Sequence, residues 1–430
     1  MRIHFIGIGG VGISGLAKYL HFLGHKISGS DVITSKMSRD VAGLGIPVSI
    51  PHSGDLIDSE IELIVHSAVI KPSNPEIIRG KELQIKILSR AEALKFILKD
   101  KKVFSICGAH GKSTTGAMLS VLIEENSIIG AYNKTYGSNV KYCEGENLVF
   151  EADESDGSFL NSNPFYSIVT NCEPEHMEFY NYDYGTFYKS YHQFLEKSKK
   201  RVINAEDPFM KDLDLEAIRL YPSKDIKILR SFLFENEPFI EFSLKEFGTF
   251  SVFGFGEHIA IDASLSILTA LDFGISVDEV RERLKNYRGI EKRFDILQNR
   301  DNFILIDDYG HHPTEIEATL GSAIQFAKMR GIENITAIWQ PHKYSRTLDN
   351  IEHFQRCFNG VSKLIILPVW KAGEEEVEID FKTLFSRYNL EFTEKLQTEK
   401  GCVRLSNGDK LESGLIIGFG AGDITYQLRK

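Results

Sequence analysis

MRIHFIGIGGVGISGLAKYL, residues 1–20, is the stretch that predicts the fold of the chain's first part. A short apolar strand runs into glycines spaced G-x-G-x-x-G, and apolar residues then recur at helical spacing. A strand, turn and helix of this kind leave backbone amides at a helix N-terminus, where a phosphate group binds well. The stretch therefore predicts a Rossmann-like domain whose first turn either holds a nucleotide diphosphate or is only a tight strand–helix turn.

The candidate ligands of that diphosphate are the residues of the turn itself. They are Gly7, Gly9, Gly10, Val11 and Gly12. Asp31 ends the next expected strand, at the place where an acidic residue binds a ribose hydroxyl in dinucleotide-binding proteins. It could equally be a solvated carboxylate at the end of a strand. The spacing leaves open which nucleotide is bound, NAD included.

Length and composition restrict the class of protein. A chain of 430 residues is too long for one ordinary core and predicts two or three domains. A net charge of −10 argues against a general nucleic-acid binder, and five scattered cysteines without a C-x-x-C pair fit a reducing compartment. No apolar run approaches 18 residues, so we expect a cytoplasmic α/β protein without membrane insertion.

Apolar strand-like runs alternate with helical segments along most of the chain, as in parallel α/β layers. The charged stretch LKDKK, residues 98–102, and the polar stretch around residues 288–300 interrupt this alternation. We therefore expect three α/β domains, at residues 1–100, 101–288 and 289–430.

A second phosphate loop, GAHGKSTT at residues 108–115, follows the expected strand VFSIC. Its glycines allow a sharp backbone path, Lys112 can reach terminal phosphates, and the Ser113 hydroxyl can bind Mg²⁺. Ile106 stands where the common form of the motif has its first glycine. The candidate ATP-binding residues are Gly108, Ala109, His110, Gly111, Lys112, Ser113 and Thr114. A dehydrogenase needs no such loop, so the pair of loops favours an enzyme that modifies a nucleotide-linked substrate with ATP.

Carboxylates follow the next expected strands. Glu151, Asp153, Glu154 and Asp156 come after one strand and offer the hard oxygen ligands that Mg²⁺ prefers. His176 follows another strand, beside Glu173 and Glu175. It is either a second metal ligand or an ordinary packing histidine.

The last expected domain carries basic and imidazole groups at its strand ends. His311 and His312 precede a helix that begins at Pro313. Lys343 and Arg346 in QPHKYSR could hold a carboxylate, because the arginine fork matches carboxylate geometry. These groups, and Arg293 in GIEKRFD, could also be solvated loop charges.

Taken in order, the segments GIGGVGISGLA, GAHGKSTT, EADESDGSF, TNCEPEHME, DDYGHHPTEI and QPHKYSRT resemble the Mur ligases of bacterial peptidoglycan synthesis. The resemblance extends from residue 1 to GFGAGDIT near the end of the chain. It implies a Rossmann-like N-terminal domain for a UDP-sugar, a central P-loop ATPase domain, and a Rossmann-like C-terminal domain that closes over an amino acid.

The resemblance also implies residue roles. The glycine turn, Asp31 and Ser67 would hold the UDP-sugar, and Lys112 the γ-phosphate. Ser113 and Glu151 would bind one Mg²⁺ ion and His176 a second. Tyr309, His311, Lys343 and Arg346 would form the amino-acid site, and Arg293 would contact phosphate when the domains close. Lys112, Glu151, His176, His311 and Arg346 would be the catalytic set.

The activity implied is the ATP-dependent ligation of L-alanine to the lactyl carboxylate of UDP-N-acetylmuramate through an acyl phosphate, by a monomer or homodimer. The departures from the family pattern are EPEHME for EPDHMD, Lys343 for an arginine, and HIAID, with Ile259 and Asp262, for HNxxN. Adenine contacts are therefore not assigned to Ile259 and Asp262. The alternatives are a murein-peptide ligase, a folylpolyglutamate synthetase, a non-catalytic nucleotide-binding regulator and an NAD dehydrogenase.

Overall fold

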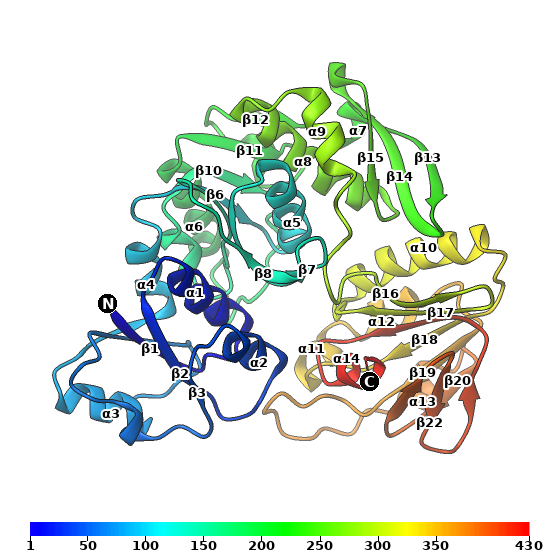
Figure 1. Ribbon diagram of the computed structural model, residues 1–430. Coiled ribbons are helices and arrows are strands. Elements are labelled where there is room, and N and C mark those ends of the chain that lie inside the picture. The colour runs from blue at the N-terminus through cyan, green and yellow to red at the C-terminus, as the bar shows by residue number, and fades with distance from the viewer. Residues whose placement is uncertain (430) are drawn as a thin grey trace. The chain divides into compact units, whose positions relative to one another are not determined.

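The computed structural model describes residues 1–429, which divide into two compact units (Figure 1). Unit 1 consists of Met1–Lys227, Leu244–Phe247 and Ile261–Tyr287. Unit 2 consists of Ile228–Ser243, Gly248–Ala260 and the described chain from Arg288 onward. None of the helices within residues 1–429 has the length and apolar character needed to cross a membrane.

The first sheet of unit 1 is parallel and has the strand order β3-β2-β1-β4-β5, which is typical of a nucleotide-binding fold. Its strands are β1 (Arg2–Ile6), β2 (Lys26–Ser30), β3 (Val48–Ser49), β4 (Leu63–His66) and β5 (Lys86–Ser89). The helices of this part are α1 (Val11–Phe22), α2 (Lys36–Gly43), α3 (Pro75–Glu82) and α4 (Arg90–Ile97), with the short η1 (Gly54–Leu56). Because β1 lies at the point where the strand order reverses, the turn that follows it lies where such folds bind their ligands.

The second sheet of unit 1 has the order β12-β11-β10-β6-β9-β7-β8. Its strands are β6 (Lys102–Cys107), β7 (Asn126–Asn133), β8 (Ser138–Lys141), β9 (Asn147–Glu151), β10 (Pro164–Val169), β11 (Lys200–Asn204) and β12 (Ile218–Leu220). Helices and short turns of this part are α5 (Lys112–Ile123), η2 (Ser158–Asn161), α6 (Tyr184–Lys197), η3 (Met210–Asp212), α7 (Pro222–Asp225), η4 (Lys245–Phe247), α8 (Glu257–Phe273) and α9 (Val277–Leu284). All pairs in this sheet are parallel except the antiparallel hairpin of β7 and β8.

One hydrophobic cluster joins the two sheets of unit 1. It runs from Ile3 and Phe5 of β1 through Leu16 of α1 to Ile128 of β7 and Val140 of β8, all of them buried. Helix α1 thus packs on its own sheet and also on the β7–β8 hairpin. The two sheets share their core, which fixes the first phosphate turn relative to the second sheet.

Unit 2 contains a six-stranded sheet of order β16-β17-β24-β18-β19-β20, parallel except for the β16–β17 pair. Its strands are β16 (Asp295–Arg300), β17 (Phe303–Asp308), β18 (Ile335–Trp339), β19 (Lys363–Ile366), β20 (Leu390–Phe392) and β24 (Gly414–Phe419). The helices are α10 (Pro313–Met329), α11 (Tyr344–Asp349), α12 (Ile351–Cys357), α13 (Phe381–Leu384) and α14 (Ile424–Leu428). Two small sheets complete the fold, β13 (Ile226–Phe234), β14 (Glu237–Leu244) and β15 (Thr249–Phe253), and β21 (Leu396–Glu399), β22 (Cys402–Leu405) and β23 (Lys410–Leu411).

The strands expected before the glycine turn, Asp31, the ATP loop, the carboxylates and His176 are present as β1, β2, β6, β9 and β10, and those expected before the two site loops of the last domain are present as β17 and β18. The polar stretch expected to interrupt the pattern near residues 288–300 contains the edge strand β16. Sequence periodicity missed this strand because an antiparallel edge strand needs little apolar character.

Candidate active site

The glycine turn at residues 7–12 has the form expected of a diphosphate site. Helix α1 begins after Gly10, whose position offers no side chain to cap the first amides of the helix. Gly7 has φ of 81°, a left-handed conformation that favours glycine. The amides at the start of α1 are therefore not capped by a side chain of the N-cap residue and can donate hydrogen bonds to an anion.

Asp31 and Ser67 both lie against this turn. The Gly9 amide donates a hydrogen bond to Asp31 Oδ2 at 2.7 Å, and the Val32 amide donates to Oδ1 at 2.7 Å. A Cβ atom on Gly7 would lie 3.1 Å from the Cβ of Ser67. The structure thus brings both predicted residues to the turn, where Asp31 supports the loop itself.

The ATP loop needs glycine at two places. Gly108 has φ of 141°, and a Cβ there would lie 2.1 Å from Thr170 Oγ1. Gly111 has φ of 79° and precedes the first residue of α5, and a Cβ there would lie 2.5 Å from Asp262 Oδ1. Asp262, in the segment that departs from the family's adenine-side pattern, therefore packs against the loop.

Lys112 is held by its own loop and by one carboxylate. Its Nζ donates to the carbonyl oxygens of Gly108 at 2.5 Å and Ala109 at 3.2 Å, and to Glu154 Oε1 at 2.9 Å. Burial alone would lower the pKa of Lys112, but the charge of Glu154 and its hydrogen bond raise it above the ordinary value. The ammonium group is therefore permanently charged at the place where a terminal phosphate would bind.

Burial raises the pKa of the Glu154 carboxyl to about 7, and the charge of Lys112 only partly opposes this. Burial likewise raises the pKa of Glu151 against the charge of Lys112 and the hydrogen bond from Gly130. For Asp153, burial would raise the pKa, but the hydrogen bond from Ser155 and the charges of Lys112 and Arg90 outweigh it and lower the pKa. Three carboxyl groups around one ammonium thus differ in their affinity for protons.

Oxygen donors suited to a divalent cation converge on Ser113. Its hydroxyl donates to Glu151 Oε1 at 3.0 Å, and Glu151 Oε2 accepts from the Gly130 amide at 2.7 Å. Glu154 Oε2 is buried and has no hydrogen-bond partner among residues 1–429. The Ser113 hydroxyl and a Glu151 carboxylate oxygen, 3.0 Å apart, fit a hard cation such as Mg²⁺, and the unsatisfied Glu154 oxygen belongs to the loop that follows β9.

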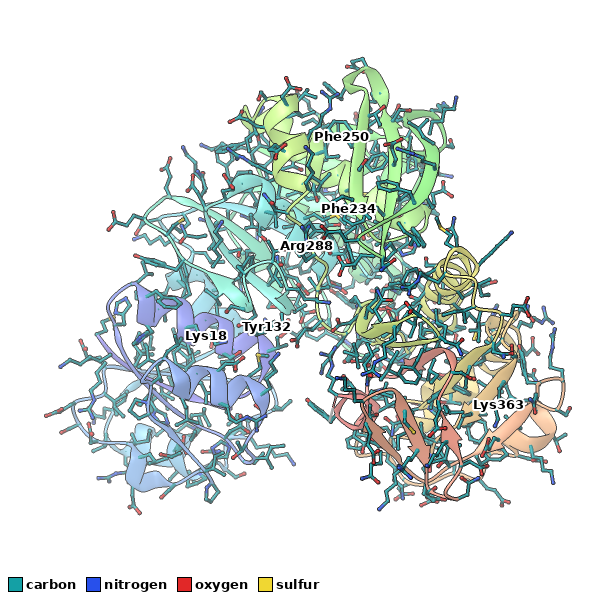
Figure 2. The ribbon with its side chains drawn as sticks, turned by 45° about the vertical axis from the view of Figure 1, so that its right-hand side comes forward. Lys18, Tyr132, Phe234, Phe250, Arg288 and Lys363 are labelled. Atoms are coloured by element: carbon teal, nitrogen blue, oxygen red, sulfur yellow. The ribbon has the colours of Figure 1, made fainter. Side chains whose placement is uncertain are left out.

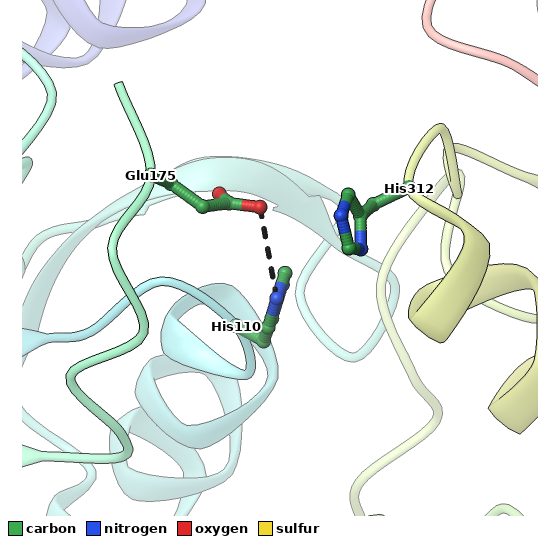
Figure 3. Close-up of side chains that lie close together, drawn as sticks. All are labelled: His110, Glu175 and His312. Carbon is green, nitrogen blue, oxygen red and sulfur yellow. Dashed lines mark ion pairs between the residues drawn. The ribbon is translucent and has the colours of Figure 1, made fainter. Parts of the chain in front are cut away.

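The structure brings His110, rather than His176, to the carboxylates of the loop after β10. His110 Nε2 lies 3.1 Å from Glu173 Oε2 and 3.6 Å from Glu175 Oε1, and Figure 3 shows the pair with Glu175. His176 is exposed, with φ of 52°, and its carbonyl accepts from the Phe179 amide. The two histidines belong to loops at the ends of β6 and β10, which are neighbours in the sheet.

In unit 2, the residues predicted for the amino-acid site gather after β17. The His311 amide donates to Glu315 Oε2 at 3.1 Å, and its ring Nδ1 lies 3.2 Å from the Tyr309 carbonyl oxygen. Arg293 pairs with Glu315 at 3.1 Å, and its guanidinium lies over the Tyr309 ring, 5.5 Å from the centroid. Glu315 therefore links the Arg293 guanidinium to the backbone of His311.

Arg346 and Lys343 approach from the loop after β18. Arg346 Nη1 lies 3.2 Å from His342 Nδ1, and the ring of His342 lies 5.9 Å from that of His311. Lys343 has φ of 67°, and its amide donates to the Trp370 carbonyl oxygen. His342, which sequence reasoning did not single out, thus lies between His311 and Arg346.

Burial lowers the pKa of His311 to about 3 and that of His342 to about 4, with the positive charge of Arg346 adding to the effect. Both rings are therefore neutral at physiological pH, so each can accept a hydrogen bond through one nitrogen and donate through the other.

Arg90 is a further residue that the sequence did not single out. Its Nη2 lies 2.9 Å from Ser158 Oγ, 3.3 Å from Asp156 and 3.4 Å from Asp153. A Cβ atom on Gly12 would lie 3.0 Å from Arg90 Nη1. The local sequence signal near Arg90 is the capping box of Ser89 and Glu92, which predicts the start of α4. It does not indicate which groups Arg90 contacts.

Comparison with known proteins identifies the family. Residues 2–102 match the Mur ligase family, catalytic domain. A UDP-N-acetylmuramate–L-alanine ligase from Campylobacter curvus is 52% identical over 432 residues, which cover 100% of this chain and 99% of that protein. The chain belongs to the Mur ligase family.

A second relative, a UDP-N-acetylmuramate–L-alanine ligase from Helicobacter pylori (strain P12), is 51% identical over 435 residues, covering 100% of this chain and 96% of the relative. The solved UDP-N-acetylmuramate-alanine ligase from Thermotoga maritima superposes with a TM-score of 0.82 at 24% identity, covering 99% of this chain and 97% of that one. The predicted Mur ligase architecture and ligase class are thereby confirmed.

Proposed function

We propose that the protein ligates L-alanine to the lactyl carboxylate of UDP-N-acetylmuramate at the expense of ATP, in peptidoglycan precursor synthesis. The observation that carries this proposal is the presence of a diphosphate turn and an ATP loop with a charged Lys112 in one Mur ligase chain. The relatives named for this ligation match the chain over its full length, which supports the choice of substrates.

A carboxylate resists attack by an amine because it is anionic and has no good leaving group. In the proposed reaction a lactyl carboxylate oxygen attacks the γ-phosphorus of ATP, the bond to the β,γ-bridging oxygen breaks, and an acyl phosphate and ADP form. The alanine amine then attacks the acyl carbon, and phosphate leaves from the tetrahedral intermediate. Such transfer depends mainly on positioning and on stabilising negative charge.

Lys112 and the loop amides supply the charge that this first step needs. The ammonium now donates to Glu154 and two loop carbonyls, so ATP binding would move it onto the phosphate oxygens. The ATP-binding set proposed is the loop of residues 108–114 together with Arg293, which would contact phosphate when the domains close.

Magnesium fits the oxygen donors of the loop. We assign Ser113 and Glu151 to one ion and keep His176 as a proposed ligand of a second, with His110 and Glu175 beside the same loop. The bound ions would offset the repulsion between the two anions that meet in phosphoryl transfer.

The alanine would bind in unit 2. Tyr309, His311, Lys343 and Arg346 form the proposed set, with Arg346 on the alanine carboxylate and the neutral His311 ring beside the amine. The alanine ammonium loses a proton to solvent before attack, and the neutral His311 ring would accept a hydrogen bond from the resulting amine.

The domain proposal assigns residues 1–100 to the UDP-sugar, 101–288 to ATP and 289–430 to the amino acid and to closure. We further propose a cytoplasmic location, where ATP and nucleotide sugars occur, and a monomeric or homodimeric enzyme.

A phosphate-release assay with UDP-N-acetylmuramate, ATP, Mg²⁺ and a panel of amino acids tests the proposal, with the product mass checked. Release that needs all three substrates, is strongest with L-alanine and yields the alanyl product supports it. Release with a preformed peptide instead of alanine would establish the murein-peptide ligase alternative. No release with any amino donor would overturn the ligase assignment.

A further inference from the structure

Lys18 is a buried lysine for which the proposed reaction has no use. It lies on α1 and its side chain is 3% exposed. Its Nζ donates to Asn139 Oδ1 at 3.0 Å, while the nearest carboxylate, Asp40 Oδ2, is 4.0 Å away. Burial lowers the pKa of Lys18, and the charge of Asp40 only partly opposes this. A methionine would fill similar space without the cost of desolvating an ammonium group, so the lysine needs another explanation.

Both polar atoms of the Asn139 side-chain amide, on β8, form hydrogen bonds with α1. Its Oδ1 accepts from Lys18, and its Nδ2 donates to the Val11 carbonyl oxygen at 3.0 Å. Val11 and Lys18 are about two helical turns apart and so lie on one face of α1. Val11 is also the first residue of the helix, directly at the glycine turn. One asparagine of the second sheet thus holds the diphosphate end of α1.

Helix α1 and the β7–β8 hairpin approach each other closely at the face of α1 that Asn139 contacts. A Cβ atom on Gly15 would lie 2.9 Å from Ile128 Cγ2 and 3.3 Å from Asn139 Nδ2. Lys36, at the start of α2, places its Nζ 3.6 Å from the ring centroid of Tyr132 on β7. Figure 2 labels Lys18 and Tyr132 at this boundary between the two sheets of unit 1.

The hairpin continues to the ATP loop. The Gly130 amide of β7 donates to Glu151 Oε2, and Glu151 Oε1 accepts from Ser113. Residues of β7 and β8 therefore contact the diphosphate turn on one side and the cation-binding oxygens on the other. This hairpin is one physical link between the two phosphate sites, beside Arg90, which lies against Gly12 and contacts Asp153 and Asp156.

We propose that Lys18 and Asn139 are positioning residues, which hold the diphosphate end of α1 on the β7–β8 hairpin and so set the separation of the two phosphate sites. The inference rests on the proposed function, because only a reaction between a UDP-linked carboxylate and ATP needs that separation fixed. A displacement of about 1 Å between reacting groups can cost on the order of 100-fold in rate.

The test compares Lys18→Met, Asn139→Leu and the double variant with the wild-type enzyme. For each, the Kd for UDP-N-acetylmuramate alone, the KM for ATP, kcat for ligation and the ratio of product formed to phosphate released are measured. We expect kcat to fall about 10- to 100-fold, with the Kd and the KM for ATP nearly unchanged and less product formed per phosphate. The double variant should lose no more than the stronger single variant, because the two residues act as one contact.

Two controls separate positioning from loss of a buried polar group. Asn126→Leu removes an equally buried asparagine, whose amide binds the Gly145 and Asn147 carbonyls within the second sheet. Lys197→Met removes an exposed lysine that donates to the Leu160 carbonyl, and so tests the loss of a lysine charge and hydrogen bond away from α1. Both controls should keep the wild-type ratio of product to phosphate.

If the leucine variant does not fold, Asn139→Asp keeps an acceptor for Lys18 and removes the donor to Val11, and it should lower kcat in the same way. Wild-type kcat and product ratio in the Lys18 and Asn139 variants, or equal losses in the Asn126 control, would overturn the inference. A wild-type enzyme that releases phosphate without UDP-N-acetylmuramate would instead overturn the proposed function.

Discussion

The Lys112 ammonium donates to Glu154 Oε1 at 2.9 Å, and the Glu154 side chain is only 2% exposed. In the proposed reaction Lys112, the cation paired with this buried carboxyl, would also bind a phosphate group of ATP. If Lys112 moved onto ATP, Glu154 would either take up a proton or gain another cation. This one pair couples the ATP loop to the carboxylates after β9.

Lys112→Met should abolish the ATP-dependent step while leaving UDP-N-acetylmuramate bound, because the lysine contacts the ATP loop and not the glycine turn. We expect kcat to fall at least about 100-fold. Steady-state phosphate release and calorimetric binding of the UDP-sugar measure the two effects. Lys102→Met, on the exposed start of β6, is the control. Retained ligation in the Lys112 variant would remove this residue from catalysis.

Glu154 should make the stability of the protein depend on pH. The pKa of Glu154 in the folded protein is about 7, above the ordinary 4.5. The stabilisation that protonated Glu154 adds to the free energy of unfolding is therefore fully present below pH 4.5 and is lost as pH rises through 7. The slope from this group is at most about 1.4 kcal/mol per pH unit. Glu154→Gln should remove this slope in urea unfolding curves measured at intervals between pH 4.5 and 8. Identical pH dependence in the variant and the wild type would contradict the assigned pKa.

His311 and His342 should stay neutral across the physiological range. Their pKa values of about 3 and about 4 lie below the ordinary 6.5, so their contribution to stability is present above pH 6.5 and is lost as pH falls toward 3 to 4. Proton NMR should show no titration of these two rings between pH 5 and 8 in the folded protein and titration near 6.5 in urea. A folded-state inflection near pH 6.5 would show that the rings are solvated.

Arg346→Ala should raise the KM for L-alanine by about 10- to 100-fold, equivalent to about 1.4 to 2.7 kcal/mol, and leave the KM for ATP unchanged. The variant loses a guanidinium group, which can donate two parallel hydrogen bonds to the alanine carboxylate. Arg346→Lys should recover only part of the loss, because it supplies a point charge. An unchanged KM for the substrate L-alanine in the Arg346→Ala variant would exclude Arg346 from the amino-acid site.

Gly15→Ala and Gly321→Ala should change stability in opposite directions. In α1 the new methyl group would meet Ile128 at 2.9 Å, and overpacking of this kind costs about 1–3 kcal/mol. In α10 the methyl group of the Gly321 variant would meet nothing within 4 Å, and replacing a helical glycine stabilises by about 0.5–1 kcal/mol. Denaturant unfolding checks both, and stabilisation by Gly15→Ala would disprove the close approach of α1 to β7.

Sequence reasoning was enough to place at strand ends the segments that we propose for the site. A parallel sheet delivers the loops after its strands to one edge, so GIGGVG, GAHGKST and EADESD could be assigned before any contact was known. Local signals were also enough for the helix that starts at Pro313.

Contacts between distant residues could not be predicted in this way. Lys18 and Asn139 are 121 positions apart, and nothing near either residue indicates the other. In the sequence, Glu173 and Glu175 lie next to His176 and favoured it as a metal ligand. In the structure it is His110 that contacts these two carboxylates, because β6 and β10 are adjacent strands. The register of strands in space, which periodicity does not encode, decides such pairs.

The cluster that joins the two sheets of unit 1 also constrains how the chain can be made. The face of α1 that packs on β7 and β8 can be covered only after Lys141, the last residue of β8, has been synthesised. At about 5–20 residues per second, the roughly 43 residues from 98 to 141 take about 2–9 s to synthesise. During that interval this apolar face of α1 is exposed on the nascent chain.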